Sequence, residues 1–594
     1  MTEIIPRHIP ADSVQHLRDS GYSSALAKIF AARGITESRQ LNTTFAELLP
    51  FDTLKNSREM ACLLADAIAA QKNILVVADY DADGATACAV AMRGLRAFGA
   101  RVDFIVPNRF EYGYGLTPEI VQLAAKNNPD ILLTVDNGIA SVEGVAEANR
   151  LGMQVFVTDH HLPGDALPDA TCIVNPNQPG CAFPSKHLAG VGVMFYVLLA
   201  LRAELRTRGA FSLSPDGTTS HSTKLSNNAS QVAGYSPSPV GGRGEPKLAN
   251  LLDLVALGTV ADVVKLDQNN RILVQQGLQR IRAGRACAGI NALLQVAKKI
   301  PARASSQDLG FTVGPRLNAA GRLDDMSLGI NCLLTDDATT AMQIAAKLDA
   351  LNRERRSIET DMQDSAQAAL ETINPSDNFS LVLFDESWHQ GVIGILASRL
   401  KDKFHRPTIA FARANNGELK GSGRSIAGLH LRDALDLVSK RHPALIKKFG
   451  GHAAAAGLSI AENDFENFIA AFEKVSSELL SASDLAQRIE TDGALDIAEM
   501  NLEVARILDE QVWGQGFPAP QFSDDFIVQN QRVVGGKHLK LHLGAKGIII
   551  EAILFGHNEM LPEQIHAVYS LSVNEYNGTQ SLQLVIRHWQ DVKG

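Results

Sequence analysis

Carboxylate and imidazole side chains recur along this chain where short apolar runs end. They follow the runs 74–78, 131–135 and 155–158, and they are Asp79, Asp81, Asp83, Asp136, Asp159, His160 and His161. Carboxylates and imidazoles without a thiolate form a donor set that suits manganese or magnesium. A pair of such ions activates water and stabilises the attacking and leaving oxygens of a phosphoryl ester. We therefore expect a two-metal phosphoesterase centre, to which Asp262, after a further apolar run, also belongs.

The spacing of the first three carboxylates supports this interpretation. Alternate residues of an extended segment point the same way, so Asp79, Asp81 and Asp83 can converge on one site. Gly84 then allows a tight turn into a helix whose N-terminus favours anions. Taken singly, each segment has a simpler explanation. Residues 79–84 could form a calcium loop or a polar turn, residues 136–138 a turn, and residues 160–161 a structural histidine pair. Their occurrence at three successive run ends favours the metal centre.

The elements that position these residues can be predicted from periodicity. Short runs rich in valine, isoleucine and leucine are typical of strands buried in a parallel sheet. In residues 70–200 such runs alternate with helical segments at 84–98 and 118–126. A further strand is expected at 102–106. This alternation predicts a doubly wound α/β domain. Ligands bind beyond the carboxyl ends of such strands, so the acidic side chains should meet at one edge of the sheet.

Composition and periodicity divide the rest of the chain. Residues 206–247 are rich in serine, asparagine, proline and glycine, and we expect a disordered insertion there. Strong helix formers at 339–372 predict a helix of about 50 Å, long enough to connect two domains, which Asn374 and Pro375 end. A second α/β unit begins with a strand at 381–384.

From residue 519 the apolar pattern has a period of two, with further strands at 548–555, 567–575 and 581–588. The dipeptide 577–578 predicts a hairpin between the last two strands, and the whole pattern indicates a small barrel such as an OB-fold.

The expected fold class is α/β, with a parallel-sheet domain, a linking helix, a second α/β domain and an all-β barrel. The expected boundaries are 1–69 (a helical or extended region packed on the core), 70–338, 339–373, 374–484 and 485–594.

The composition is that of a globular enzyme, with 45% hydrophobic and 20% charged residues among 594. The sequence begins without a basic and apolar leader, and its longest apolar stretch, near 191–201, is too short for a bilayer, so we expect a cytoplasmic protein without membrane contact. Six scattered cysteines without a CxxC pair argue against disulfides and zinc–thiolate sites. The net charge of −9 mildly disfavours nucleic acid as a partner, although metal-binding carboxylates inflate it and a local basic groove can coexist with it.

The acidic segments, ending in Asp159-His160-His161, resemble the first three motifs of the DHH phosphoesterase superfamily, and residues 258–264 resemble its fourth. Residues 314–322 and 450–457 resemble signatures of the single-stranded-DNA-specific exonucleases in this superfamily, the second being the mark of the DHHA1 domain. The resemblance covers nearly the whole chain except the insertion. It implies hydrolysis of single-stranded DNA from the 5′ end to mononucleotides, in repair and recombination, alongside a helicase and a single-strand-binding protein. We expect a monomer.

The resemblance also implies a role for each residue of the metal centre. Asp81 and Asp136 would hold one metal ion, with Asp79 nearby as a possible ligand. The second ion would be held by Asp83, Asp136, His160 and Asp262, which makes Asp136 the bridge. His161 would contact the scissile phosphate or orient the water, and Asp159 would fix the imidazoles. The ions would be manganese or magnesium, and no organic cofactor is expected.

Further residues are candidates for contact with the strand. They are Arg109, Tyr114, Arg316, Asn318, Arg322, His389, Ser422, Arg424, Gly451 and His452. Residues 421–425 combine backbone amides, hydroxyls and a guanidinium, which suits a terminal phosphate, although an exposed hairpin turn explains them as well. Residues 450–452 would place an imidazole opposite the metals, and the alternative is a glycine-rich helix start.

Two rival functions stay open. One is a small-substrate DHH hydrolase acting on oligoribonucleotides, nucleoside bisphosphates or pyrophosphate, whose members lack the C-terminal barrel that this sequence predicts. The other is a non-catalytic scaffold that binds single strands with a decayed site. The acidic residues of the predicted centre are all present, which disfavours the scaffold.

Overall fold

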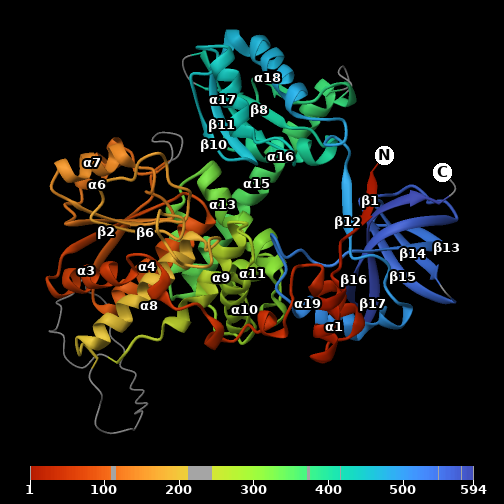
Figure 1. Cartoon of the computed structure of the whole chain (residues 1–594), viewed down its shortest axis with the longest axis horizontal. Helices are drawn as coiled ribbons and strands as arrows, with labels where there is room; N and C mark the ends of the chain where they lie inside the picture. Colours follow the sequence, from red (N-terminus) through yellow and green to blue (C-terminus); the bar gives the residue numbers. More distant parts are fainter. Residues whose placement is uncertain are drawn as a thin grey trace, which may run out of the picture.

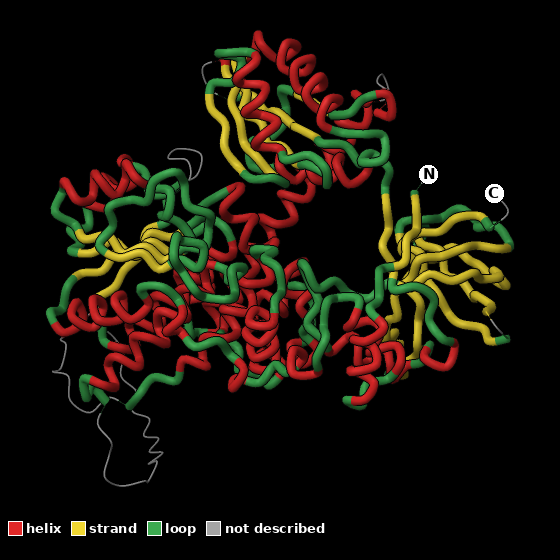
Figure 2. Tube along the Cα trace, viewed as in Figure 1, coloured by secondary structure: helices red, strands yellow, loops and turns green. Residues whose placement is uncertain are grey.

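The computed structural model describes residues 2–108, 115–211, 244–370, 375–414, 417–545, 547–576 and 578–592, with only the backbone of Ser376 and Tyr576. A central helical body carries a parallel sheet on one side and a β-barrel on the other (Figure 1). A third domain is joined to this body by helix α15 (Ala338–Leu370) and by the segment that contains strand β12 (Arg488–Thr491). Figure 2 shows the strands gathered in these separate regions.

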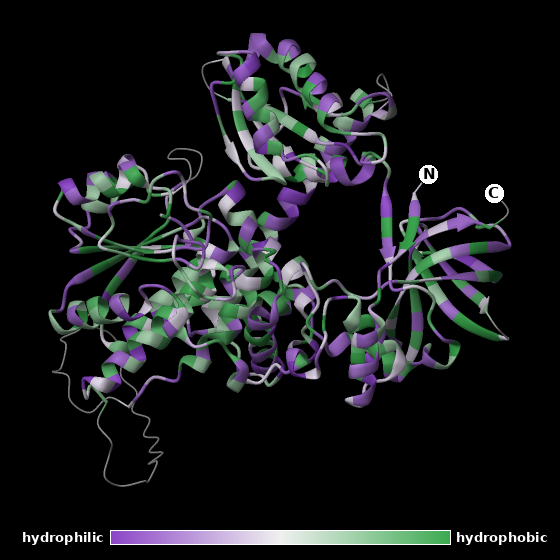
Figure 3. Ribbon diagram, in the orientation of Figure 1, coloured by the Kyte–Doolittle hydropathy of each residue, from purple (hydrophilic) through white to green (hydrophobic). Residues whose placement is uncertain are grey.

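The first domain is built on a five-stranded sheet in the order β3-β2-β4-β5-β6, in which every neighbouring pair is parallel. Its strands are β2 (Asn73–Ala78), β3 (Arg101–Ile105), β4 (Ile131–Val135), β5 (Gln154–Thr158) and β6 (Cys172–Val174). Helices cover both faces, and they are α3 (Ser57–Ala69), α4 (Ala82–Phe98), α6 (Pro118–Ala125), α7 (Val142–Arg150) and α8 (Gly190–Thr207). Ile74 and Val76 pack into one hydrophobic core and Leu75 and Val77 into another, as in a doubly wound sheet. The inner strands are mostly hydrophobic, whereas the edge strand β3 carries the exposed Arg101 and Asp103 (Figure 3).

The central body consists of short helices that follow the sheet domain in the chain. They are α9 (Leu252–Ala261), α10 (Gln268–Arg282), α11 (Ala288–Val296), α12 (Ser306–Asp308), α13 (Gly314–Leu323) and α14 (Ser327–Leu334). A π-helical turn, Leu309–Val313, precedes α13. Near the N-terminus lie strand β1 (Glu3–Pro6) and helices α1 (Ala11–Asp19) and α2 (Ser24–Ala31). One hydrophobic core runs from the sheet domain through these helices into the barrel, so they form one packed body.

The third domain contains a mixed sheet in the order β10-β11-β9-β8-β7. Its elements are β7 (Leu381–Phe384), α16 (Ile393–Phe404), β8 (Thr408–Arg413), β9 (Glu418–Arg424), α17 (Leu431–Arg441), β10 (Lys448–Gly451), β11 (Ala455–Ala461) and α18 (Phe465–Leu479). Only β7 and β8 are parallel among the described pairs of this sheet. The segment 450–452 therefore lies at the end of a strand, and the alternative of a helix start is wrong.

The C-terminal domain is a closed five-stranded barrel in the order β13-β14-β15-β17-β16. Helix α19 (Leu502–Glu510) precedes β13 (Phe522–Val534), β14 (His538–Ala545), β15 (Ile548–Phe555), β16 (Gln564–Tyr576) and β17 (Thr579–Asp591). Leu539, Leu541 and Leu543 are buried, so the predicted alternation on β14 is confirmed. β16 and β17 pair antiparallel up to their connecting turn, as the hairpin prediction requires.

The expected fold class is confirmed by these sheets and by the barrel. The predicted strands 381–384 and 548–555 coincide with β7 and β15, and the predicted helix 339–372 corresponds to α15. Most of the predicted insertion, residues 212–243, lies outside the described residues, as do Asn374 and Asn577. Within the described ranges, no helix combines the length and apolar character needed to cross a membrane.

Candidate metal centre

Three neighbouring strands deliver the acidic residues to one edge of the first sheet. The last residues of β2, β4 and β5 pair with one another in parallel register. Asp79, Asp136 and Asp159, which come next, therefore leave the sheet side by side. The C-terminal end of α9 brings Asp262 to the same place, where it lies beside His160.

The side chains at this edge form three overlapping groups of potential ligands, in each of which the ligand atoms lie within 4.8 Å of one another. The groups are Asp79–Asp81–Asp136, Asp83–His160–Asp262 and Asp136–His160–His161. Every predicted catalytic residue except Asp159 belongs to a group, and Asp136 and His160 each belong to two. This arrangement suits two adjacent cations that share ligands.

His160 lies between two carboxylates. Its Nε2 is 3.1 Å from Asp136 Oδ1 and 3.4 Å from Asp262 Oδ2. Within the described part of the chain, His160 Nε2 and Asp262 Oδ2 are buried without a well-formed hydrogen bond. Buried polar atoms are ordinarily paired, so atoms left in this state and aimed at one another fit a site that holds a cation.

Asp83 is fixed by the start of α8. Its Oδ2 accepts a hydrogen bond from the backbone N–H of Gly190 (2.7 Å), and its Oδ1 accepts one from Val191 (2.9 Å). Gly190 is needed for a second reason, because a Cβ at this position would lie 2.5 Å from Asp136 Oδ1. The start of α8 therefore orients Asp83 and leaves room for Asp136. Sequence patterns did not reveal this role of the helix.

Asp159 supports the imidazoles from behind. Its Oδ1 lies 2.7 Å from His161 Nδ1 and accepts the backbone N–H of His160 (2.7 Å), while Oδ2 accepts the N–H of Ile139 (2.8 Å). A carboxylate engaged on both oxygens in this way orients a neighbouring side chain. Asp159 therefore contacts both histidine residues, and its orienting role stays a prediction.

Two asparagines that the sequence reasoning missed hold the histidine backbone. Asn175 Nδ2 donates to the carbonyl of His161 (3.0 Å), and Asn177 Nδ2 donates to that of His160 (2.6 Å). They follow β6, the next strand of the same sheet. The available signal was another polar segment after an apolar run, but a strand of three residues is too short for periodicity to identify.

Burial and mutual repulsion disfavour ionisation of the clustered carboxylates. Burial, followed by the charge of Asp81, raises the pKa of Asp83 to about 7. Burial and the neighbouring carboxylates, Asp83 foremost, raise the pKa values of Asp136 and Asp262 well above the usual range. Divalent cations would reverse this cost by placing positive charge among the carboxylates.

The two histidines differ in their electrostatics. Burial and the adjacent His161 lower the pKa of His160 to about 4, so this imidazole is neutral and suited to coordinate a metal. Although burial opposes the charged form of His161, its hydrogen bond to Asp159 and the charges of Asp159, Asp79 and Asp81 raise its pKa to about 9. These carboxylates therefore favour the charged form of His161, which suits contact with a phosphate.

The third domain presents a polar surface around the start of α16. Arg424 donates to Ser422 Oγ (3.2 Å) and to the carbonyl of Gly423 (2.7 Å). A Cβ at Gly394, in the first turn of α16, would lie 2.9 Å from Ser422 Oγ and 3.0 Å from Arg424 Nη2, so the helix start is in contact with both. A helix start beside a hydroxyl and a guanidinium can bind a phosphate.

His452 of the third domain lies within electrostatic reach of the metal centre. Burial, followed by the charge of His161, lowers the pKa of His452. Gly451 before it has φ of 145° and leaves no space for a Cβ, which would lie 2.4 Å from the carbonyl oxygen of Ala455. His389 accepts a hydrogen bond at Nδ1 from the N–H of Gly391 (3.1 Å). His452 thus interacts electrostatically with the strand-end histidines, and its predicted role in strand binding stays a prediction.

Helix α13 connects the metal loop with its surroundings. Asn318 Oδ1 accepts the N–H of Ala82 (2.7 Å), and Arg322 Nη1 donates to the carbonyl of Gly391 in the third domain (2.9 Å). Arg316 donates to Asp349 of α15 (3.0 Å) and to a carbonyl of the preceding turn, so it braces two helices. Arg109 and Tyr114 lie outside the described residues.

Family models match most of the chain. The DHH family N-terminal domain matches residues 73–214, the DHHA1 domain matches residues 377–478, and the RecJ OB domain matches residues 491–588. These matches fall on the sheet domain, the third domain and the barrel.

Curated relatives and solved structures are similar over nearly the whole length. The single-stranded-DNA-specific exonuclease RecJ of Dickeya dadantii is 47% identical over 95% of this chain and 95% of its own, and that of Escherichia coli is 46% identical over 94% and 95%. The crystal structure of Thermus thermophilus RecJ in complex with Mn²⁺ has a TM-score of 0.79 at 28% identity, covering 99% of this chain and 79% of that one. The Mg²⁺ complex of the same protein has a TM-score of 0.74 at 27% identity, covering 99% and 78%.

Proposed function

This chain belongs to the RecJ family of single-stranded-DNA-specific exonucleases, and we propose that it hydrolyses single-stranded DNA from the 5′ end to mononucleotides with the help of two divalent metal ions. The observation that carries this proposal is the convergence of carboxylates and imidazoles from three strand ends and α9 on one site. RecJ structures of similar fold contain Mn²⁺ or Mg²⁺, and the oxygen-rich donor set here fits either ion.

We propose the following ligands. Asp81 and Asp136, with Asp79, would hold one ion, and Asp83, His160 and Asp262, with Asp136, would hold the other. When bound, such ions supply an activated water and neutralise charge that develops on a phosphodiester. Asp136 is common to both sets, in agreement with its 3.1 Å contact to His160.

The remaining side chains bind and orient the strand in this proposal. His161, held by Asp159, places a positive imidazole at the scissile phosphate. Ser422, Arg424 and the first turn of α16 bind the 5′-terminal phosphate, which limits hydrolysis to strand ends. His452, whose pKa responds to the charge of His161, would contact the strand from the third domain, so the strand end would lie between the two domains.

The domain boundaries are also a proposal, in which residues 1–69 form a region packed on the core, 70–338 the DHH domain, 339–373 the linking helix, 374–484 the DHHA1 domain and 485–594 the barrel. The matched family domains lie within these limits. Single-stranded DNA is the substrate in this account. We further propose that the protein is a cytoplasmic monomer. It would act beside a helicase and a single-strand-binding protein in repair and recombination.

The experiment that tests this function is digestion of 5′-labelled and 3′-labelled single strands, with duplex DNA beside them, in manganese, magnesium or chelator. We expect metal-dependent release of mononucleotides from the 5′ end of single strands only. Cleavage limited to dinucleotides or nucleoside bisphosphates would contradict the proposal in favour of a small-substrate hydrolase. Strand binding without cleavage would favour a scaffold.

A further inference from the structure

Asn137 links the ends of two neighbouring strands beside the carboxylate cluster. Its side chain is buried, and its Nδ2 donates to the carbonyls of Val77 in β2 (3.1 Å) and Val135 in β4 (3.0 Å). Asp79 lies two residues after Val77, and Asp136 lies directly after Val135. One amide group therefore ties together the two points from which the segments that carry these carboxylates leave the sheet.

This link completes the end of the sheet around β4. On the β5 side, the backbone N–H of Asp136 donates to the carbonyl of Thr158 (3.0 Å). On the β2 side, the side chain of Asn137 adds a link of its own. The parallel ladder between β2 and β4 ends at the pair Ala78–Val135, so the amide of Asn137 holds the two strands together where their ladder ends.

The backbone around Asn137 is held by β4 itself. The carbonyl of Asn137 accepts a hydrogen bond from Oγ1 of Thr134 (2.7 Å), a fully buried residue of β4. Gly138 has φ of 115°, and a Cβ at this position would lie 2.6 Å from the same Oγ1. The segment therefore packs too closely on β4 to shift, and its amide is fixed in contact with β2.

The side chain of Asn137 also keeps an unpaired oxygen. Among the described residues, Oδ1 of Asn137 is buried and has no hydrogen-bond partner. Buried polar atoms are ordinarily paired, and an unpaired one is destabilising. The opposite orientation of the amide would place Oδ1 against two carbonyl oxygens, so the contacts determine which atom donates. The two hydrogen bonds and this cost oppose each other, which points to a role at the site rather than in overall stability.

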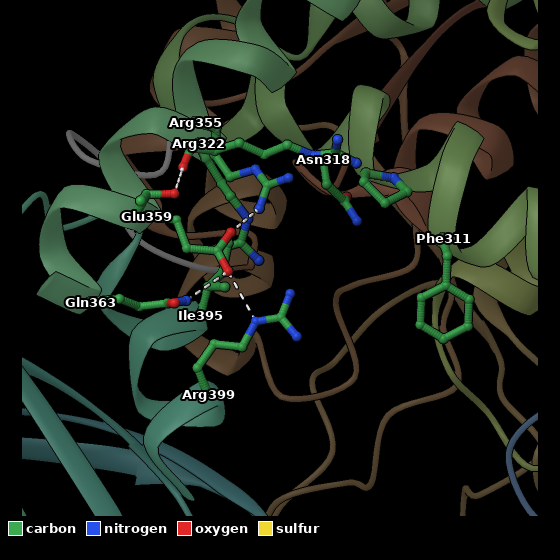
Figure 4. Close-up of a pocket in the computed structure, with 11 residues that line it drawn as sticks. Phe311, Asn318, Arg322, Arg355, Glu359, Gln363, Ile395 and Arg399 are labelled. Atoms are coloured by element: carbon green, nitrogen blue, oxygen red, sulfur yellow. Dashed lines mark hydrogen bonds and ion pairs between the residues drawn. The ribbon is translucent and has the colours of Figure 1, made fainter. Parts of the chain in front are cut away.

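The far end of the loop that follows β2 is fixed independently. The N–H of Ala82 donates to Oδ1 of Asn318 (2.7 Å), a residue of α13 that also lines the arginine-rich cavity shown in Figure 4. A Cβ at Gly321 would lie 2.0 Å from the carbonyl oxygen of Tyr80, so α13 packs directly on the loop. Asn137 therefore secures the start of a loop whose end is already held.

The two strands that Asn137 joins supply the ligands of one proposed ion, which we call the first ion. Its group takes two ligands from the loop after β2 and one from the end of β4, and it is Asp79–Asp81–Asp136. The second ion has the group Asp83–His160–Asp262, in which Asp83 is held instead by the start of α8. Metal–ligand distances vary by only about 0.2 Å, so the first ion depends on the spacing between the ends of β2 and β4.

We propose that Asn137 is a positioning residue for the first ion. Its two hydrogen bonds set the distance between the loop after β2 and the end of β4. The second ion depends on Asn137 less, because Asp136 keeps its bond to Thr158 and the other ligands have separate supports. The inference rests on the proposed two-metal function and specifies which residue keeps one of the two ions in place.

The test is isothermal titration calorimetry of the metal-free, full-length protein with Mn²⁺, without DNA. Asn137→Ala should weaken one of the two binding steps by roughly ten- to a hundredfold, the usual effect of removing a residue that orients metal ligands. The other step should change little. Asn137→Ser keeps one donor for the two carbonyls, so it should weaken the same step by a smaller factor.

Hydrolysis of single strands provides a second readout. In Asn137→Ala, the Mn²⁺ concentration that gives half the maximal rate should rise by a similar factor, because the weakened site needs more metal to fill. The rate at saturating Mn²⁺ should return close to the normal value. A purely structural loss would instead lower the rate at every Mn²⁺ concentration.

Asn270→Ala is the matched control. Asn270 is fully buried in α10, and its Nδ2 likewise donates to two carbonyls, those of His187 (2.7 Å) and Lys265 (2.9 Å). Its Oδ1 is also buried and unpaired within the part of the chain that the structure describes. This variant should bind both ions as the unaltered protein does. Thermal melting in chelator checks that all variants are folded, and Asn137→Ser carries the test if Asn137→Ala is not.

Equal weakening of both binding steps in the Asn137 variants, or no change in either step, would overturn the positioning role. Equally weak Mn²⁺ binding by Asn270→Ala would overturn it too. If one step weakens as predicted but the unaltered protein hydrolyses no single strands, the proposed function fails and the positioning role stands. Binding of only one ion by the unaltered protein would overturn both.

Discussion

Asp136 occupies an unusual backbone conformation at the centre of the carboxylate cluster. Its φ of 62° lies in the left-handed region, which residues other than glycine rarely adopt. Such strain persists where the surrounding structure fixes it, and it is concentrated at functional sites. Here the N–H of Asp136 donates to the carbonyl of Thr158 (3.0 Å), and Gly190 passes close to its carboxylate. The conformation directs the side chain toward His160.

The first prediction concerns Asp136 itself. Asp136→Ala should lower the rate of single-strand hydrolysis roughly a thousandfold or more, because both metal positions lose a shared ligand. Strand affinity should change little, since the proposed strand contacts lie elsewhere. Initial rates and binding of a labelled strand measure the two effects.

Asp130→Ala is the matched control for this prediction. Asp130 lies before the opposite end of the same strand, is exposed, and accepts the N–H of Asn73 (2.7 Å). It should retain nearly full activity. Hydrolysis by Asp136→Ala at an appreciable fraction of the normal rate would refute the shared-ligand assignment.

The second prediction separates orientation from coordination at Asp159. Asp159→Asn should reduce activity by about ten- to a hundredfold, the usual effect of removing a residue that orients metal-site side chains. The asparagine can accept hydrogen bonds but carries no charge to hold an imidazolium. Rates measured at saturating Mn²⁺ distinguish this role. A loss as deep as that of Asp136→Ala would mean that Asp159 is a ligand, and no loss would mean that it orients nothing.

At the scale of elements, local sequence patterns predicted the strands and the residues at their ends, because local interactions determine both. Strands β7 and β15 were located to the residue, because short apolar runs bounded by polar residues or glycine are a local signal. The ends of the predicted strands also indicated that the metal residues would lie close together, because the carboxyl ends of parallel strands meet at one edge of the sheet. Strand β1 was not predicted as part of a sheet, since its partner β12 lies about 485 residues away and no local pattern encodes the pairing. The support from Gly190 could not be predicted because it depends on tertiary contacts, and that from Asn175 and Asn177 was missed because the strand before them has only three residues.

A buried ion pair joins the end of helix α2 to the segment between β12 and the barrel, which gives the third prediction. Arg33, just beyond α2, donates to both carboxylate oxygens of Asp492 (2.7 and 3.1 Å), and the side chains are 0% and 2% exposed. Arg33→Ala should reduce the free energy of unfolding by about 3–5 kcal/mol, because it leaves a buried carboxylate without its partner. Denaturation followed by tryptophan fluorescence suits this measurement, since Arg33 lies over the ring of Trp513 (5.2 Å).

Arg39→Ala is the control for the ion pair. Arg39 pairs with Glu47 (3.0 Å), but its side chain is 77% exposed. An exposed pair contributes about 1 kcal/mol or less, so this variant should unfold almost as the unaltered protein does. Equal destabilisation by the two variants would contradict the importance given to burial.

At the scale of the whole molecule, two segments of the chain join the third domain to one packed body. Helix α15 is the first, and the second is the segment before the barrel, in which β12 pairs in parallel with β1. The net charge of −9 is compatible with a nucleic-acid partner in this arrangement. The acidic residues of the metal centre contribute to that charge, whereas the surface proposed to bind the terminal phosphate carries Arg424.

The fourth prediction tests the second connection. Deletion of residues 2–7 removes β1 and its four residue pairs with β12. Residues 480–492 should then be cleaved faster in limited proteolysis, because β12 becomes an unpaired segment. Cleavage sites identified by mass spectrometry provide the measurement, and helix α17 of the third domain, which packs on that domain's own core, serves as the internal reference. An unchanged cleavage rate at 480–492 would show that β1 does not secure this connection.

The central claim is that the strand-end carboxylates form a two-metal centre that hydrolyses single-stranded DNA. The most direct measurement is titration of the metal-free protein with Mn²⁺, in which bound ions are counted by electron paramagnetic resonance while the hydrolysis rate is followed in the same samples. The account predicts two bound ions per chain, activity that appears with the second ion, and loss of at least one ion in Asp136→Ala. Full activity with a single bound ion, or two tightly bound ions in Asp136→Ala, would contradict it.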